Sequence, residues 1–244
     1  MNRIARRLLQ ISFAVSGMML CLPAGAHYLW FQHEKTNGHL YFGEYEEMLR
    51  ERSPGRLDEM PGPQIRALAR DGKTVSLPAT REAGGFRFAM PASNATVLAI
   101  EPGYAVKDWR KYNNGIVKPM FYARLAGEPA LAQKETLPLD IVPTGKAGEF
   151  RVLFKDAPLA ATEVRVIAPN AWVRETKTDK DGVVRFELPW RGQYLLHAVH
   201  LERSAGVFES KEYEAIRHRT TTSVTVRTGA PTKVPTSWQA SGAE

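Results

Sequence analysis

The sequence predicts an all-β protein made of two β-sandwich domains of the immunoglobulin-like or transthyretin-like type, preceded by a cleaved signal peptide. Sixteen prolines and nineteen glycines interrupt the 244-residue chain at short intervals. The apolar runs between them are short and rich in Val, Ile, Phe, Tyr and Thr, the residues that favour strands. In the C-terminal half, turn signals separate these runs at intervals typical of a β-sandwich.

Residues 1–26 have the features of a secretory signal peptide. Its parts are a positive start, an apolar stretch and a small-x-small cleavage site: Arg3, Arg6 and Arg7, then residues 8–22, then Ala24-Gly25-Ala26. The apolar stretch is too short and too interrupted for a stable membrane span. We therefore expect cleavage after Ala26, a mature chain that starts with His27, and a periplasmic or secreted location. Cleavage after Ala24 is the alternative.

Composition narrows the chemistry of the mature chain. The formal charge of +7 falls to +4 without the leader, because residues 1–26 contain three arginines and no acid. The remaining basic residues are scattered among acids, so no nucleic-acid partner is expected. Cys21, the single cysteine, lies in the leader, which excludes thiol chemistry and a cysteine zinc site in the mature chain. Leu20 before it disfavours a lipoprotein anchor.

The first predicted domain covers residues 27–133. Its expected strands are residues 39–42, 85–90 and 95–101, which carry β-branched and aromatic side chains. Short helices or loops are expected at residues 46–52 and 62–70, and a long exposed loop at residues 105–118, which are polar. Gly, Pro, Ala and Gln accumulate at residues 125–135, which indicates a boundary there.

The second predicted domain covers residues 134–228. Six strands are expected, at residues 137–143, 148–154, 163–167, 183–188, 193–201 and 220–227. Asp179 to Gly182 predict a tight turn, because the carboxylates can accept backbone hydrogen bonds and the glycine allows a positive φ. Residues 229–244 are rich in Pro, Thr, Ser and Ala, which predicts a disordered tail.

Two resemblances extend this interpretation. The hairpin of residues 176–194, with Thr178-Asp179-Lys180-Asp181-Gly182, Phe186 and Gly192-Gln193-Tyr194, resembles that of carboxypeptidase-regulatory, transthyretin-like sandwiches. The wider layout is similar to the DUF4198 family of exported bacterial proteins, through Ala26-His27-Tyr28-Leu29-Trp30, Tyr41-Phe42-Gly43-Glu44, and residues 139–143, 152–159 and 194–200. Some members carry the label of periplasmic components of nickel or cobalt uptake. The resemblance implies two Ig-like sandwiches and a link to these metals.

The histidines carry the predicted metal chemistry. All six lie near the two ends of the mature chain: His27, His33, His39, His197, His200 and His218. Imidazoles suit copper, nickel, zinc and iron. A terminal His27 would offer its α-amine and its imidazole to one ion, and one further imidazole would complete a three-nitrogen site.

The second ligand has several candidates. His200 and His197 are preferred, His218 follows, and His33 can face His39 across a hairpin turn at Asn37-Gly38. His197 and His200 are three residues apart, so on a regular strand they point to opposite faces and are alternatives. A packed core histidine is the competing interpretation for both, and a solvated strand edge for His218. Glu44 or Glu46 could complete the coordination sphere, although a solvated acidic stretch is the simpler interpretation.

Enzyme motifs are absent from the sequence: it contains no G-x-S-x-G, no phosphate-binding glycine loop and no H-E-x-x-H. We therefore expect no catalytic residue and no organic cofactor; a histidine-brace copper oxygenase is the minority alternative. The sequence predicts a periplasmic carrier or uptake accessory for nickel, cobalt or copper, with an inner-membrane transporter or another envelope protein as partner. The alternative is a non-catalytic envelope interaction or scaffold module.

Overall fold

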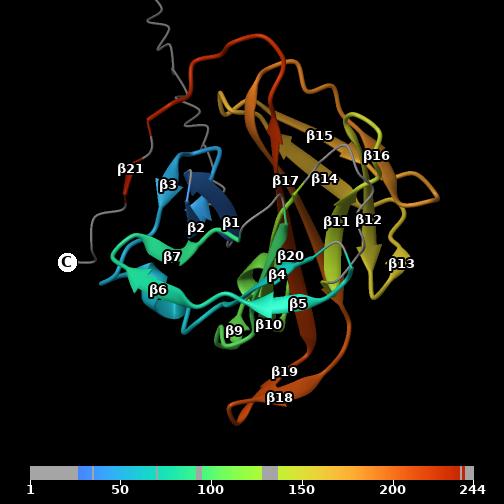
Figure 1. Ribbon diagram of the computed structural model, residues 1–244. Helices are drawn as coiled ribbons and strands as arrows, with labels where there is room; N and C mark the ends of the chain where they lie inside the picture. The colour runs from blue at the N-terminus through green and yellow to red at the C-terminus, as the bar shows by residue number, and fades with distance from the viewer. Residues whose placement is uncertain are drawn as a thin grey trace, which may run out of the picture.

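The computed structural model describes residues 27–34, 36–69, 71–91, 95–127, 137–236 and 238–239, and the predicted signal peptide lies outside them. Strands dominate the described chain (Figure 1). Its helical segments are two short 3-10 helices, η1 (Arg56–Glu59) and η2 (Arg110–Tyr112). No helix within these ranges is long and apolar enough to cross a membrane. The predicted all-β sandwich fold is confirmed.

A nine-stranded sheet forms the centre of the molecule. Its strands, in spatial order, are β15 (Val173–Lys177), β14 (Glu163–Ile167), β17 (Gly192–Glu202), β20 (Ala215–Val226), β10 (Ile116–Leu125), β8 (Thr96–Glu101), β4 (Gln64–Leu68) and β5 (Thr74–Ser76), and β9 (Lys107–Asp108) also pairs with β10. β10 and β20 pair in parallel, whereas the other described neighbours in this sheet are antiparallel. The β10–β20 junction joins strands of both predicted domains, so the division at residue 133 cuts across one continuous sheet.

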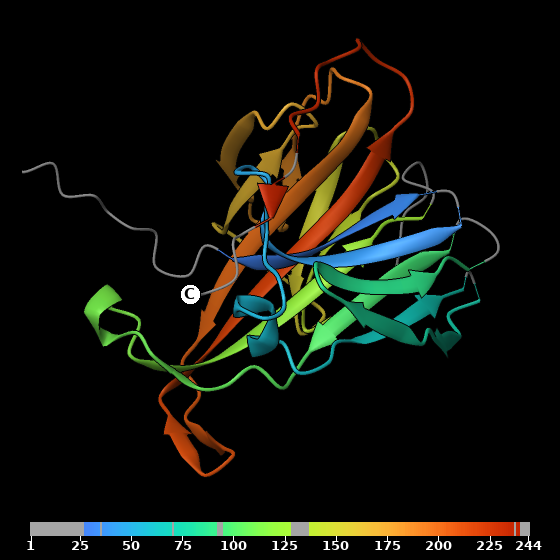
Figure 2. The same cartoon turned by 90° about the vertical axis from the view of Figure 1, so that its left-hand side faces the viewer.

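Two smaller sheets pack against the central one. The first contains β1 (Tyr28–Glu34), β2 (Asn37–Glu44), β3 (Leu49–Arg50), β6 (Ala79–Glu82), β7 (Gly85–Ala89) and β21 (Trp238–Gln239). The second contains β11 (Leu139–Pro143), β12 (Glu149–Phe154), β13 (Ala157–Pro158) and β16 (Val183–Arg185). A hairpin of β18 (Gly206–Phe208) and β19 (Lys211–Tyr213) extends away from the body (Figures 1 and 2).

Alternate side chains of β20 hold the two smaller sheets on opposite faces. Thr222 donates a hydrogen bond to the Ile141 carbonyl of β11, at 2.7 Å. Its neighbours Thr221 and Ser223 point the other way and donate to carbonyls of β1, at 2.6 and 2.8 Å. Since successive side chains of a strand alternate between faces, β20 lies between the two layers. The blue strands β1 and β2 cross β17 and β20 in Figure 2.

The open edge of β1 is capped by side chains rather than by another strand. β1 pairs with β2 along one edge. On the other edge, the carbonyls of His27, Leu29 and Phe31 accept hydrogen bonds from Arg219, Thr221 and Ser223 of β20, in that order. This arrangement satisfies backbone groups that would otherwise be buried without partners. It also fixes the position of His27.

Two large apolar cores fill the layers. One lies between the central sheet and the β11–β12 sheet and includes Tyr122, Ile141 and Leu196. The other lies under the β1–β2 sheet and includes Phe42 and Phe121. Each is assembled from several strands, as a sandwich requires.

Some local expectations were wrong. Residues 64–68 form strand β4, not a helix or loop; Ile65 and Ala67 are buried on either side of the more exposed Arg66, and β4 pairs with β8 and β5. Residues 105–118 contain β9, η2 and the start of β10. In the expected disordered tail, Ala230 bridges to Trp190 and β21 pairs with the open edge of β3.

The hairpin between β1 and β2 also differs from the expected Asn37-Gly38 turn. Asn37 already pairs with Glu34, and Gly38 lies within β2. A Cβ on Gly38 would overlap the ring of Phe88, so close packing rather than a turn requires glycine here. The turn at residues 179–182 is confirmed: Asp179 accepts hydrogen bonds from the backbone of Asp181 and Val183, and Gly182 has a φ of 72°.

Candidate functional site

His27 directly precedes β1 and is buried, with 8% of its surface exposed. Tyr28 pairs with Gly43 in the β1–β2 ladder, which places His27 opposite Glu44 at the end of β2. Its carbonyl accepts a hydrogen bond from Arg219, and its ring lies 5.3 Å from the Phe42 ring, centroid to centroid. Backbone and side chain are thus both held in place.

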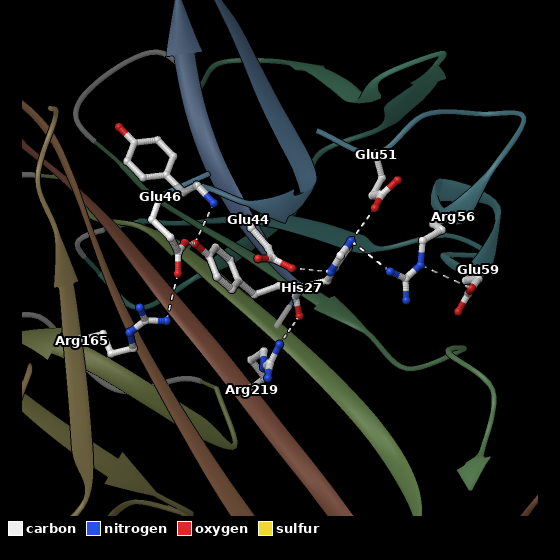
Figure 3. Close-up of polar contacts among 10 residues, drawn as sticks. His27, Glu44, Glu46, Glu51, Arg56, Glu59, Arg165 and Arg219 are labelled. Carbon is white, nitrogen blue, oxygen red and sulfur yellow. Dashed lines mark hydrogen bonds and ion pairs between the residues drawn. The ribbon is translucent and has the colours of Figure 1, made fainter. Parts of the chain in front are cut away.

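Two carboxylates face the two imidazole nitrogens (Figure 3). His27 Nδ1 lies 2.9 Å from Glu44 Oε1, and His27 Nε2 contacts Glu51 Oε1. Arg56 Nη1 approaches the same Nε2 at 3.4 Å. The hydrogen bond from His27 lowers the pKa of Glu44 and outweighs the opposite effect of burial. Of the two candidate carboxylates, Glu44 is therefore the one that lies at His27.

Glu46, the other expected carboxylate, lies elsewhere in the structure. It accepts a hydrogen bond from the Tyr28 hydroxyl and pairs with Arg165 at 2.9 Å (Figure 3). Tyr28 and His27 are consecutive on a strand, so their side chains point to opposite faces. Glu46 is thus engaged on the other side of β1.

A cavity of about 250 Å³ adjoins His27. Its lining contains cationic, acidic and aromatic side chains: Phe42, Arg56, Glu59, Tyr104, Lys107, Asp108, Trp109, Lys111, Tyr112 and Phe121, besides His27. Glu59 accepts hydrogen bonds from Lys107, at 2.7 Å, and from the Tyr104 hydroxyl. Burial acts to raise the pKa of Glu59, but these hydrogen bonds outweigh it and lower the pKa.

His197 and His200 point to opposite faces of β17, as their spacing predicts. The His197 ring packs on Tyr28, with centroids 4.8 Å apart, and neither of its nitrogens has a hydrogen-bond partner among the described residues. Burial, reinforced by nearby arginines, lowers the pKa of His197. His200 packs on Phe154 on the opposite face. His197 is therefore a packed core histidine.

His200 and His218 are direct neighbours on β17 and β20. Their ring centroids are 6.3 Å apart. His218 Nδ1 lies 2.9 Å from the Tyr122 hydroxyl, and its Nε2 lies 3.0 Å from Glu202 Oε2. Burial is the main cause that lowers the pKa of both histidines. His218 is thus buried and hydrogen-bonded, not part of the solvated edge that its flanking arginines indicate.

The expected site that combines His27 with His200 or His218 does not form. Arg219, which contacts His27, and His218 are consecutive on β20 and point to opposite faces. The central sheet therefore separates His27 from His200 and His218. His197 contacts Tyr28, whose side chain lies on the other side of β1 from His27.

The backbone register of β1 and β2 does not place His33 directly opposite His39. The His33 side chain lies outside the described residues, while its backbone pairs with Gly38. His39 pairs with Gln32 and its ring stacks on Tyr41. Across the described ranges, no group of three or more His, Cys, Asp or Glu side chains is arranged to hold a metal ion. His27, Glu44 and Glu51 do not form such a group, because the two carboxylates lie at different nitrogens of the ring and do not face a common point.

Sequence reasoning found His27 and Glu44 but missed Glu51, Arg56 and Arg219. Glu51 follows β3, Arg56 begins η1, and Arg219 comes from β20, which is distant in sequence. No local pattern singles them out, because only the tertiary fold brings them to the imidazole. Buried side chains of this kind need partners, and here those partners come from separate elements.

Comparison with known proteins gives a family but no activity. No curated protein matches the chain. Residues 24–202 match a domain of unknown function, DUF4198, and this match spans well over half of the chain. The chain therefore belongs to the DUF4198 family.

Proposed function

We propose that this protein is an exported carrier or uptake accessory for nickel, cobalt or copper, and that it binds the metal at His27 and Glu44. The observation that carries the proposal is the 2.9 Å distance between His27 Nδ1 and Glu44 Oε1, at the residue where the mature chain is expected to start. This site replaces the expected combination with His200 or His218.

The donor set suits a divalent transition metal. Cleavage after Ala26 would give His27 a free α-amine, which can bind one ion together with its own Nδ1. Glu44 supplies an oxygen beside that nitrogen. A set of two nitrogens and one carboxylate oxygen fits nickel, cobalt, copper and zinc, and leaves coordination positions open for a further ligand. Open positions suit a carrier, because a ligand from a receiving transporter or other envelope protein can coordinate the bound ion there.

The surroundings support this role in two ways. The Arg219 hydrogen bond to the His27 carbonyl and the β1–β2 ladder hold the residue, so little ordering would be needed on binding. The lowered pKa of Glu44 keeps its carboxylate ionised at neutral pH. Amine and imidazole nitrogens bind metals only when deprotonated, so affinity falls as the pH drops.

The test uses tag-free mature protein that starts with His27, titrated with copper, nickel, cobalt and zinc by calorimetry. We expect one ion per chain. A chain with one additional glycine before His27 keeps the imidazole but loses the terminal chelate, and Glu44→Gln removes the carboxylate; each should weaken binding at least tenfold. His39→Ala is the matched control, since that ring stacks on Tyr41 away from the site.

A lack of stoichiometric binding to all four metals would overturn the proposal. The alternative, a non-catalytic envelope interaction or scaffold module, would then stand. One observation favours that alternative: the central sheet separates His27 from His200 and His218. A metal ion therefore does not join the two predicted domains through these histidines in the described residues.

A further inference from the structure

The cavity beside His27 carries more positive charge than its carboxylates can offset. Three cationic side chains line it: Arg56, Lys107 and Lys111. Its two carboxylates are already engaged. Glu59 accepts hydrogen bonds from Lys107 and Tyr104 and lies 4.0 Å from Arg56 Nε, and Asp108 forms a bidentate pair with Arg110. Lys111 lies over the Tyr112 ring, 4.6 Å from its centroid.

Two further arginines strengthen the positive field from behind the lining. The Arg217 guanidinium lies 5.6 Å from the centroid of Trp109, which lines the cavity. Burial lowers its pKa to about 10. Arg219 contacts the His27 carbonyl, and its Nε has no hydrogen-bond partner among the described residues.

Arg217 is half-buried, and a cation withdrawn from water in this way is costly unless an opposite charge is near. An anion in the cavity would offset that cost, and positively lined clefts concentrate anions from solution. Aromatic side chains also line the cavity: Tyr104 is buried, and Trp109 and Tyr112 lie on the segment from β9 to η2. A volume of about 250 Å³ admits only a small molecule.

We infer that this cavity binds a small aromatic carboxylate, with the carboxylate at Arg56 and Lys111 and the ring against Trp109 and Tyr112. Guanidinium and ammonium groups recognise carboxylates through charge-assisted hydrogen bonds. Aromatic rings pack edge-to-face or offset against one another. This binding does not require a metal at His27, so it goes beyond the proposed function.

The experiment uses mature protein freed of metal on a chelating resin. Benzoate, benzamide and inorganic phosphate are titrated, with binding followed by calorimetry and by tryptophan fluorescence. Benzoate should bind one molecule per chain, at least tenfold more tightly than neutral benzamide and than phosphate. Benzamide has the same ring without the charge, and phosphate has the charge without the ring.

Lys111→Ala should weaken benzoate binding at least fivefold. Lys73→Ala is the matched control, because Lys73 is exposed, pairs with Asp71 and removes the same charge far from the cavity lining. Thermal unfolding shows whether both variants fold. The inference is overturned if benzoate does not bind at millimolar concentration, if benzamide or phosphate binds as tightly, or if the two variants behave alike.

Metal titration of the same preparation separates the two ideas. Glu44→Gln should weaken metal binding and leave benzoate binding unchanged, because Glu44 does not line the cavity. Lys111→Ala should weaken benzoate binding and leave metal binding unchanged. Metal binding without benzoate binding would remove this inference alone, and the reverse result would remove the proposed function alone.

Discussion

Arg124 and Asp140 form a bidentate ion pair that is fully shielded from solvent. Arg124 Nε lies 2.9 Å from Asp140 Oδ1, and Nη2 lies 2.6 Å from Oδ2, with both side chains 0% exposed. Arg124 belongs to β10 of the central sheet, and Asp140 belongs to β11 of the sheet packed on it. The pair therefore joins two layers of the fold.

Removing one partner of this pair should be costly. Asp140→Ala leaves a buried guanidinium without its counter-charge, so we expect the free energy of unfolding to fall by about 3–5 kcal/mol. The double variant Arg124→Met with Asp140→Leu removes both charges and should recover much of that loss. Urea unfolding monitored by circular dichroism measures both. A double variant as unstable as Asp140→Ala would contradict this explanation.

Lys118 predicts a pH-dependent stability at alkaline pH. Its Nζ donates to the Pro102 and Tyr104 carbonyls, and burial lowers its pKa to about 8. Between pH 8 and the unfolded value near 10.5 the unfolded chain binds more protons, so stability rises with pH. From pH 8 to 10 the free energy of unfolding of the wild type should rise by on the order of 2 kcal/mol relative to that of Lys118→Met. Urea unfolding at several pH values measures this. If the stability of the two proteins changes equally with pH, the low pKa of Lys118 is refuted.

Glu44 predicts an acid-dependent loss of stability. Its pKa is lowered chiefly by the hydrogen bond from His27, so its contribution is present above about pH 4.5 and is lost as pH falls through the folded-state pKa. Glu44→Gln should therefore lose less stability than the wild type between pH 5 and 3. Urea midpoints measured in this range test it, with the exposed Glu163→Gln as control. Equal acid sensitivity of the two variants would count against a role for Glu44.

The hydroxyls that cap β1 predict a specific stability cost. Thr221→Val keeps the shape of the side chain but leaves the Leu29 carbonyl without its 2.6 Å hydrogen bond. An unsatisfied buried acceptor costs about 1–3 kcal/mol. The same substitution at Thr225, which is only partly buried on the same strand, should cost less. Chemical denaturation measures the stability of both variants. Equal losses of stability would show that the hydrogen bond to the Leu29 carbonyl is not the cause.

Strand patterns predicted much of this fold. The apolar pattern predicts the strand at residues 163–167 with its observed bounds, and strand alternation correctly predicts that His197 and His200 point to opposite faces. The pairing of β10 with β20 could not be predicted, because a strand's pattern tells which face is buried but not which strand lies beside it. Likewise, Glu51 and Arg219 reach His27 only through tertiary packing.

The capped edge of β1 has a consequence for the order of folding. Its three carbonyl acceptors and their donors on β20 are each separated by 192 residues. Contacts between such distant segments form late, because a long loop must close before they can stabilise anything. During synthesis the first strand emerges long before its partners, so its edge stays open until almost the whole chain has left the ribosome. A chain that stops before Ala215 lacks all three of these donors and keeps only that of Gln193 to Phe31, so such truncated chains should self-associate.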